Sequence, residues 1–182
     1  MSTTDNTPFL LLPGEGEDSA GMLIKMRAHE LGGAFSVMEA HVEPDQLLIP
    51  HTHDTADQAV FVIEGELIFE VGGEGGTVFA APAGSYVKKP AGVSHGFWNK
   101  GAITARYIEL SAGEAFEHFV DDADREPLEA SVTAPIEHGV TFHFERVPAL
   151  MRAHGLTSLR GAELSGPVAQ KVTGLIGRFA GA

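Results

Sequence analysis

The chain has 182 residues, with 12 basic against 25 acidic side chains and no cysteine. That length fits one domain with a sizeable core, and the formal net charge of −13 disfavours nucleic acid and anionic membranes as partners. The lack of cysteine excludes disulfides, thiolate metal sites and a cysteine nucleophile. Because the first apolar run, "FLLL" at 9–12, is shorter than a signal-peptide core and no run approaches a membrane span, we expect a cytoplasmic protein.

The first two thirds of the chain have the pattern of strands. Residues 1–8 are polar and are predicted to be disordered. Beyond them, short apolar segments alternate with Gly, Pro and Asp, which predicts strands at 21–28, 34–42, 46–49, 58–65, 66–71, 76–81, 85–90, 96–100 and 103–110. The "GGEGG" at 72–76 is not followed by a Lys-Ser/Thr pair, so it is predicted to be a hairpin turn and not a phosphate loop. Short strands repeating about every ten residues are typical of a β-sandwich or a closed barrel.

After residue 110 the pattern becomes helical. Ser111 and Glu114 have the spacing of a helix capping box, which predicts a helix to about residue 121. A proline-marked segment follows, then a predicted strand at 140–147, a short helix at 148–156 and apolar residues at helical spacing within 162–182. We therefore expect one domain, with a barrel over 9–120 and a mostly helical extension over 121–182 packed on it.

Two histidines stand two positions apart in "IPHTHDTADQAVFVIEG" (49–65). On a strand, alternate side chains share a face, so His51 and His53 point the same way and can clamp a divalent metal ion. The position expected to supply a carboxylate holds Gln58 instead. Strand alternation turns the neighbouring Asp57 to the opposite face, so Asp57 is interpreted as a solvated acid.

A third histidine lies in "GSYVKKPAGVSHGFWN" (84–99). Gly84, Pro90 and Gly92 precede it and suit tight turns. His95 and Asn99 complete the pattern G-x5-P-x-G-x2-H-x3-N.

Together the two segments resemble the two signature motifs of the cupin superfamily. The second motif is matched at every position, and the first, G-x5-H-x-H-x3–4-E-x6-G, is matched except at its opening Gly and at its Glu, where Gln58 stands. From residue 8 to residue 157 the chain is similar to the single-barrel quercetin dioxygenase-like cupins. The resemblance implies a mainly β fold, with one cupin β-barrel of the jelly-roll type, C-terminal helices packed on it, and a homodimer.

The resemblance also implies one divalent metal ion at the centre of the barrel. Its ligands would be His51, His53 and His95, with Gln58 at the carboxylate position. Imidazole-rich sites accept nickel, iron, copper, zinc, cobalt or manganese, so the identity of the metal stays open. Four apolar residues are predicted to line a substrate pocket, although any small barrel needs such residues to fill its interior: Phe35, Val60, Val62 and Phe97.

Gln58 bears on the mechanism that the resemblance implies. In the quercetin-cleaving relatives the carboxylate also deprotonates the enolic hydroxyl of the substrate, which an amide cannot do at neutral pH. We therefore predict that Gln58 is a neutral ligand or a hydrogen-bond partner of metal-bound water, and that no protein carboxylate helps the proton to leave. Substrates whose enols are already acidic would then be preferred.

Three functions remain open. The resemblance favours a metal-dependent dioxygenase that uses O2 on an enolic or polyphenolic small molecule such as a flavonol or a diketone. A non-oxidative cyclase, isomerase or lyase of a polyketide-like substrate would use the same metal as a Lewis acid. A metal- or ligand-binding cupin without turnover is the third. His41 shares the strand parity of Phe35 and Val37 and could reach the mouth of the cavity, but it is interpreted as a strand-end residue. Four histidines after residue 110 have no ligand spacing and are assigned no role: His118, His138, His143 and His154.

Overall fold

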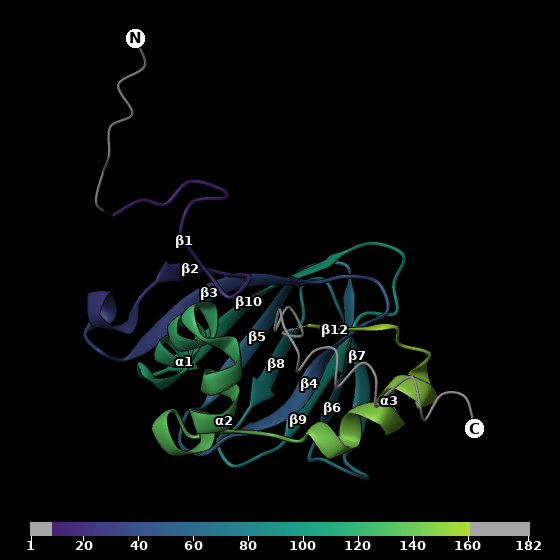
Figure 1. The fold of residues 1–182 in the computed structure, drawn as a ribbon. Helices are drawn as coiled ribbons and strands as arrows, with labels where there is room; N and C mark the ends of the chain where they lie inside the picture. The colour runs from purple at the N-terminus through teal and green to yellow at the C-terminus, as the bar shows by residue number, and fades with distance from the viewer. Residues whose placement is uncertain (1–8, 161–182) are drawn as a thin grey trace.

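The structure is a computed structural model that describes residues 9–160. Two sheets face each other to form a mostly β sandwich, which confirms the predicted fold class (Figure 1). The disorder predicted for residues 1–8 and the helix predicted within 162–182 lie outside the described residues.

The first sheet has the strand order β1-β2-β3-β10-β5-β8. All of its neighbouring strands pair antiparallel. Its strands are β1 (Glu17–Ser19), β2 (Met22–Met26), β3 (Phe35–Val42), β10 (Ala105–Ala112), β5 (Gln58–Glu64) and β8 (Tyr86–Lys89).

The second sheet has the strand order β11-β4-β9-β6-β7, and β12 pairs with β4 in parallel. The "GGEGG" segment joins β6 to β7 as the predicted hairpin. The strands of this sheet are β11 (Val140–Phe142), β4 (Gln46–His53), β9 (His95–Trp98), β6 (Glu66–Val71), β7 (Thr77–Pro82) and β12 (Ser158–Arg160).

Two apolar clusters hold these layers together. The larger fills the space between the sheets and includes Met38, Val62, Phe69, Phe97 and Tyr107. The smaller lies between the outer face of the second sheet and helix α3 (Val147–His154), with Leu47, Ile49 and Trp98 on the strand side. Burial of such side chains contributes roughly 1.5–3 kcal/mol each.

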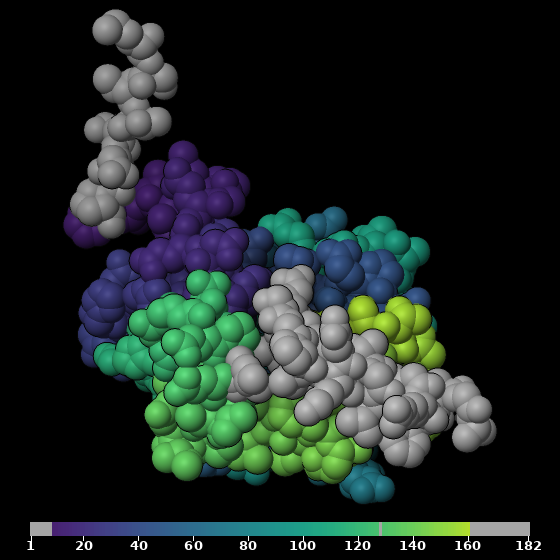
Figure 2. All heavy atoms as spheres, in the orientation of Figure 1, coloured from purple at the N-terminus to yellow at the C-terminus, as the bar shows by residue number. Residues whose placement is uncertain are grey.

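The helices cover one end and one face of the sandwich. Helices α1 (Ala115–Arg125) and α2 (Pro127–Glu137) follow β10, and two short 3-10 helices are η1 (Ala28–Leu31) and η2 (Phe144–Arg146). Figure 2 shows α1, in green, directly against the N-terminal strands in purple. Ser19 and Ala20 donate hydrogen bonds to α1 there. None of the described helices is long and apolar enough to span a membrane.

Three predictions for the segment after residue 110 need correction. Ser111 is not a helix cap: β10 continues to Ala112, and α1 begins at Ala115. Ser111 pairs with Ser36 of β3 on one side and with Gln58 of β5 on the other. Pairing with these two strands, which are distant in sequence, keeps Ser111 in β10 despite its local helix-capping pattern. The proline-marked segment forms α2, with Pro127 in its first turn, where proline is tolerated. The strand predicted at 140–147 ends at Phe142.

Candidate metal centre

The three predicted histidines meet on neighbouring strands. β4 carries His51 and His53, and His51 is the cross-strand partner of His95 on β9. The pairing of β4 with β9 shifts by one residue between Leu48 and His51, which marks a β-bulge at Ile49 and Pro50. Across this bulge, Leu48 packs against the core between the sheets and Ile49 joins the cluster under α3. His51 lines the cavity, and the ring of His53 packs against those of His95 and Phe116.

The geometry of these rings is that of a metal-binding cluster. One ring nitrogen from each of His51, His53 and His95 lies within 4.8 Å of the others. The Nδ1 atom of His51 lies 2.8 Å from the carbonyl oxygen of Ile49, and that of His95 lies 3.0 Å from the carbonyl oxygen of Val93. A carbonyl can only accept, so both Nδ1 atoms donate and both Nε2 atoms present lone pairs.

Burial keeps these imidazoles neutral, which is the form that binds metal. Desolvation lowers the pKa of His51 to about 3 and that of His53 to about 2, and it also lowers the pKa of His95. The buried Nε2 atom of His53 has no hydrogen-bond partner within residues 9–160. An orphaned nitrogen beside two converging lone pairs fits a cation.

Gln58 is buried on β5, the strand of the first sheet between β10 and β8. Its Nε2 atom donates a 3.1 Å hydrogen bond to Ser111 Oγ. Its Oε1 atom is buried and finds no hydrogen-bond partner in the described part of the chain. The amide oxygen is therefore available as a neutral ligand, and its ligation of a metal stays a prediction.

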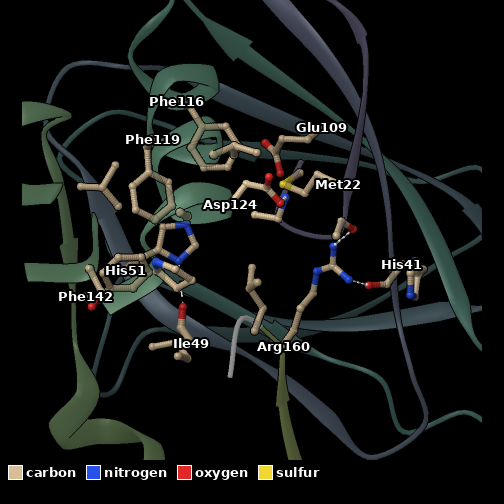
Figure 3. Close-up of a pocket in the computed structure, with 18 of the residues that line it drawn as sticks. Met22, His41, Ile49, His51, Glu109, Phe116, Phe119, Asp124, Phe142 and Arg160 are labelled. Carbon is tan, nitrogen blue, oxygen red and sulfur yellow. Dashed lines mark hydrogen bonds between the residues drawn. The ribbon is translucent and has the colours of Figure 1, made fainter. Parts of the chain in front are cut away.

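A cavity of about 580 Å³ opens beside His51 (Figure 3). Phe116 and Phe119 of α1 and Phe142 of β11 form its wall next to His51. Arg160 lies at the other end, where it donates hydrogen bonds to the backbone oxygens of His41 and Gly21.

Comparison with known proteins agrees with this fold. Residues 38–112 match the family model of the cupin domain. These residues form a cupin domain. No curated protein matches the chain.

Solved structures with a similar fold are distant in sequence. BH2720 of Bacillus halodurans is 18% identical with a TM-score of 0.43, and the match covers 44% of this chain and 64% of that one. The polyketide cyclase RemF of Streptomyces resistomycificus is 21% identical (TM-score 0.44, covering 50% and 63%). A sugar phosphate isomerase of Silicibacter pomeroyi is 24% identical (TM-score 0.42, covering 50% and 59%). The matched part of this chain therefore spans less than two thirds of the length of each of these three proteins.

The glycine and asparagine of the cupin motifs have structural roles here. Gly65, between β5 and β6, has φ +75°, and a Cβ atom there would lie 3.1 Å from Ala105. Asn99 is buried, and its Nδ2 atom donates to the carbonyl oxygens of Val42 and Ile103. Both residues therefore shape turns of the cupin fold.

The residues predicted to line a substrate pocket lie elsewhere. Val60, Val62 and Phe97 are fully buried in the core between the sheets, and Phe35 is 41% exposed. None of the four is among the residues that line the cavity. The wall is instead aromatic, from α1 and β11, elements whose approach to β4 no local pattern indicates.

The sequence also did not reveal a buried ion pair inside the barrel. Lys89 Nζ donates to Glu109 Oε2 at 2.7 Å, and both side chains are at most 2% exposed. Both line the cavity together with His51. The cavity beside His51 therefore contains a protein carboxylate that the sequence analysis did not identify. The sequence did contain a sign of this burial. Glu109 lies two residues after Tyr107 on β10, so alternation along the strand places both side chains on the same buried face.

Asp57 and three of the remaining histidines make local contacts outside the cluster. Asp57 is exposed and accepts a 2.9 Å hydrogen bond from the backbone nitrogen of Ala91. His143 bonds Thr52 Oγ1, His138 bonds Asp122, and His154 packs against the ring of Trp98.

Proposed function

We propose that this cupin is a metal-dependent dioxygenase that cleaves an enolic or polyphenolic small molecule, such as a flavonol or a diketone, with O2. The observation that carries the proposal is the convergence of His51, His53 and His95 beside a cavity walled by aromatic rings. The quercetin dioxygenase-like character of the two sequence motifs supports the same substrate class.

The donor set fits one divalent transition metal ion. Three neutral imidazoles and the amide oxygen of Gln58 bring no negative charge, so the positive charge of the ion would be balanced by an anionic ligand or substrate. When bound, such an ion would polarise an enolic oxygen and, if it is redox-active, pass electrons to O2. Imidazole ligands leave nickel, iron, copper, zinc, cobalt and manganese open.

The cavity suits a planar substrate. Its 580 Å³ falls within the range of about 300–1,000 Å³ typical of small-molecule sites. The rings of Phe116 and Phe119 lie 6.2 Å apart and nearly parallel, and Phe142 lies 5.6 Å from Phe119. These rings would bind the faces of an aromatic substrate and exclude water from it.

A second candidate function is non-oxidative. Lys89 and Glu109 are acid–base groups in the same cavity, and acid–base steps need no O2. A metal-dependent cyclase, isomerase or lyase of a polyketide-like substrate would use them.

Oxygen uptake separates the two candidates. Purified protein is analysed for metal, reloaded with each candidate ion and mixed with flavonols and β-diketones in an oxygen electrode. Substrate-dependent O2 uptake that the His51→Ala/His95→Ala variant lacks is the expected result. Product formation under anaerobic conditions would instead favour the non-oxidative function, and neither result with any metal would contradict both.

A further inference from the structure

The Lys89–Glu109 pair occupies the inner face of the first sheet. In the strand register, Lys89 is opposite Gln58 and Glu109 is opposite Val60, on the two sides of β5. The two side chains therefore reach toward each other across β5, 2.7 Å apart. The Lys89 Nζ atom also lies 5.9 Å from the centre of the Phe97 ring, on the facing sheet. The pair thus lies between the sheets, at the level of the candidate metal centre.

One oxygen of Glu109 is free to accept a proton. Oε2 accepts from Lys89, whereas Oε1 is buried and has no hydrogen-bond partner within residues 9–160. Glu109 lines the cavity that His51 also lines (Figure 3). A substrate that contacts His51 therefore shares a cavity with the Glu109 side chain.

The burial of this ion pair does not by itself indicate a structural role. Replacing a buried ion pair with apolar residues of similar volume is often neutral or stabilising, so such a pair is weak evidence for a structural role. Burial raises the pKa of Glu109, which the charge of Lys89 opposes, and burial lowers the pKa of Lys89. A desolvated carboxylate of this kind is a stronger base than a carboxylate in water.

We propose that Glu109 accepts the proton of the substrate hydroxyl, in place of the carboxylate that Gln58 lacks, and that Lys89 is the residue that positions Glu109. The inference rests on the proposed function, because it takes the substrate to be an enol or a phenol. In the step, the O–H bond of the substrate breaks and its electron pair stays on the substrate oxygen as an enolate. The proton forms a new O–H bond at Glu109 Oε1. No oxidant is consumed.

The test counts protons when an enolic probe binds. Protein loaded with zinc, which is redox-inactive, is mixed anaerobically with a flavonol in weak buffer. Absorbance reports the enolate that forms, and a pH indicator reports the protons that reach the solvent. We expect wild type to bind the flavonol as its enolate with no proton released. Glu109→Gln should bind it in neutral form, or release one proton for each enolate formed, and should lose roughly 10²–10⁴-fold in kcat/KM with the active metal.

Two further variants keep the test decisive. Lys89→Met/Glu109→Gln removes both charges, so it should fold even if Glu109→Gln alone does not, and it should show the proton release of Glu109→Gln. Glu70→Gln is the matched control, because Glu70 pairs with Arg146 in a partly buried ion pair and does not line the cavity. It should behave as wild type.

The outcomes separate this inference from the proposed function. Release of one proton per enolate in wild type, or the same release and spectrum in wild type and both Glu109 variants, would overturn the role of Glu109. If the substrate proton were transferred to the protein but no metal gave O2 uptake, the role of Glu109 as proton acceptor would be supported. Only the proposed dioxygenase function would then be overturned. If no flavonol or β-diketone bound to wild type, both proposals would fall.

Discussion

The Nε2 atoms of His51 and His95 lie 3.1 Å apart, and neither carries a proton, since each ring donates from Nδ1 to a backbone carbonyl. Two lone pairs at this distance repel each other, and burial denies them the water that would separate them. A bound cation would convert that repulsion into two attractive contacts, and the unpartnered Nε2 atom of His53 would supply a third.

Replacing His51, His53 or His95 with Ala should therefore each weaken metal binding by more than the roughly 10–100-fold typical of losing an outer-shell partner. Chelator competition measures the affinity, and elemental analysis measures the occupancy. His41→Ala is the control, because the His41 side chain is half exposed and outside the cluster. Full occupancy in a His51→Ala/His95→Ala variant would contradict the assignment.

The metal-free protein should lose stability as the pH falls from about 6.5 toward 3. The folded pKa of His51 is about 3 and that of His53 about 2, against an ordinary 6.5. In that window the unfolded chain binds protons that the folded chain does not, so stability rises with pH. Each such histidine contributes a slope of up to about 1.4 kcal/mol per pH unit.

Urea unfolding at several pH values, with chelator present, measures this slope. His53→Phe removes one of the groups and should make the dependence shallower. Equal slopes for wild type and this variant would show that His53 titrates normally in the folded protein.

Lys89→Met should destabilise the protein by about 3–5 kcal/mol, because it leaves the Glu109 carboxylate buried without its partner. Lys89→Met/Glu109→Leu removes both charges and should recover most of that loss. Chemical unfolding of the two variants beside wild type measures the difference. If the double variant were as unstable as the single one, the pair would be holding the barrel together rather than serving the cavity.

Gln58→Glu should keep the metal and raise the turnover of flavonol-like substrates, because it adds a base at the carboxylate position. The gain should be small in the wild-type background, where Glu109 is present, and larger in a Glu109→Gln background. Steady-state kinetics against pH, normalised to metal content, measures both. Loss of a wild-type activity in Gln58→Glu would mean that the amide, with its hydrogen bond to Ser111, has a positive role.

Truncation after Leu156 should be less stable than truncation after Arg160. The shorter chain loses β12, which pairs with β4 at Gln46, Leu47 and Leu48. It also loses the Arg160 hydrogen bond to the Gly21 oxygen, 2.7 Å long. Thermal unfolding of the two chains measures the difference. Equal midpoints would show that β12 contributes nothing measurable to the fold.

The central strands could be predicted because their signals are local. Apolar residues alternating with polar ones, bounded by turn residues, predicted four strands whose ends agree with the observed ends to within one or two residues: β3, β5, β6 and β7. The prediction of a helix cap at Ser111 from the local sequence was wrong, because Ser111 pairs with strands that are far away in the sequence. Helix α2 was missed for a related reason, since proline is a breaker inside a helix but is tolerated in its first turn.

Motif spacing by itself selected His51, His53 and His95, which the structure brings into one group, whereas ligation by Gln58 stays a prediction. Only the tertiary structure decided which way they face. Leu47 shares the parity of His51 along β4 but packs under α3, because the register shift between Leu48 and His51 reverses the alternation. The contact between Lys89 and Glu109 likewise depends on β8 and β10 flanking β5, a register set by long-range strand pairing. Such pairing joins residues that no local pattern relates, so the contact between Lys89 and Glu109 became visible only in the folded chain.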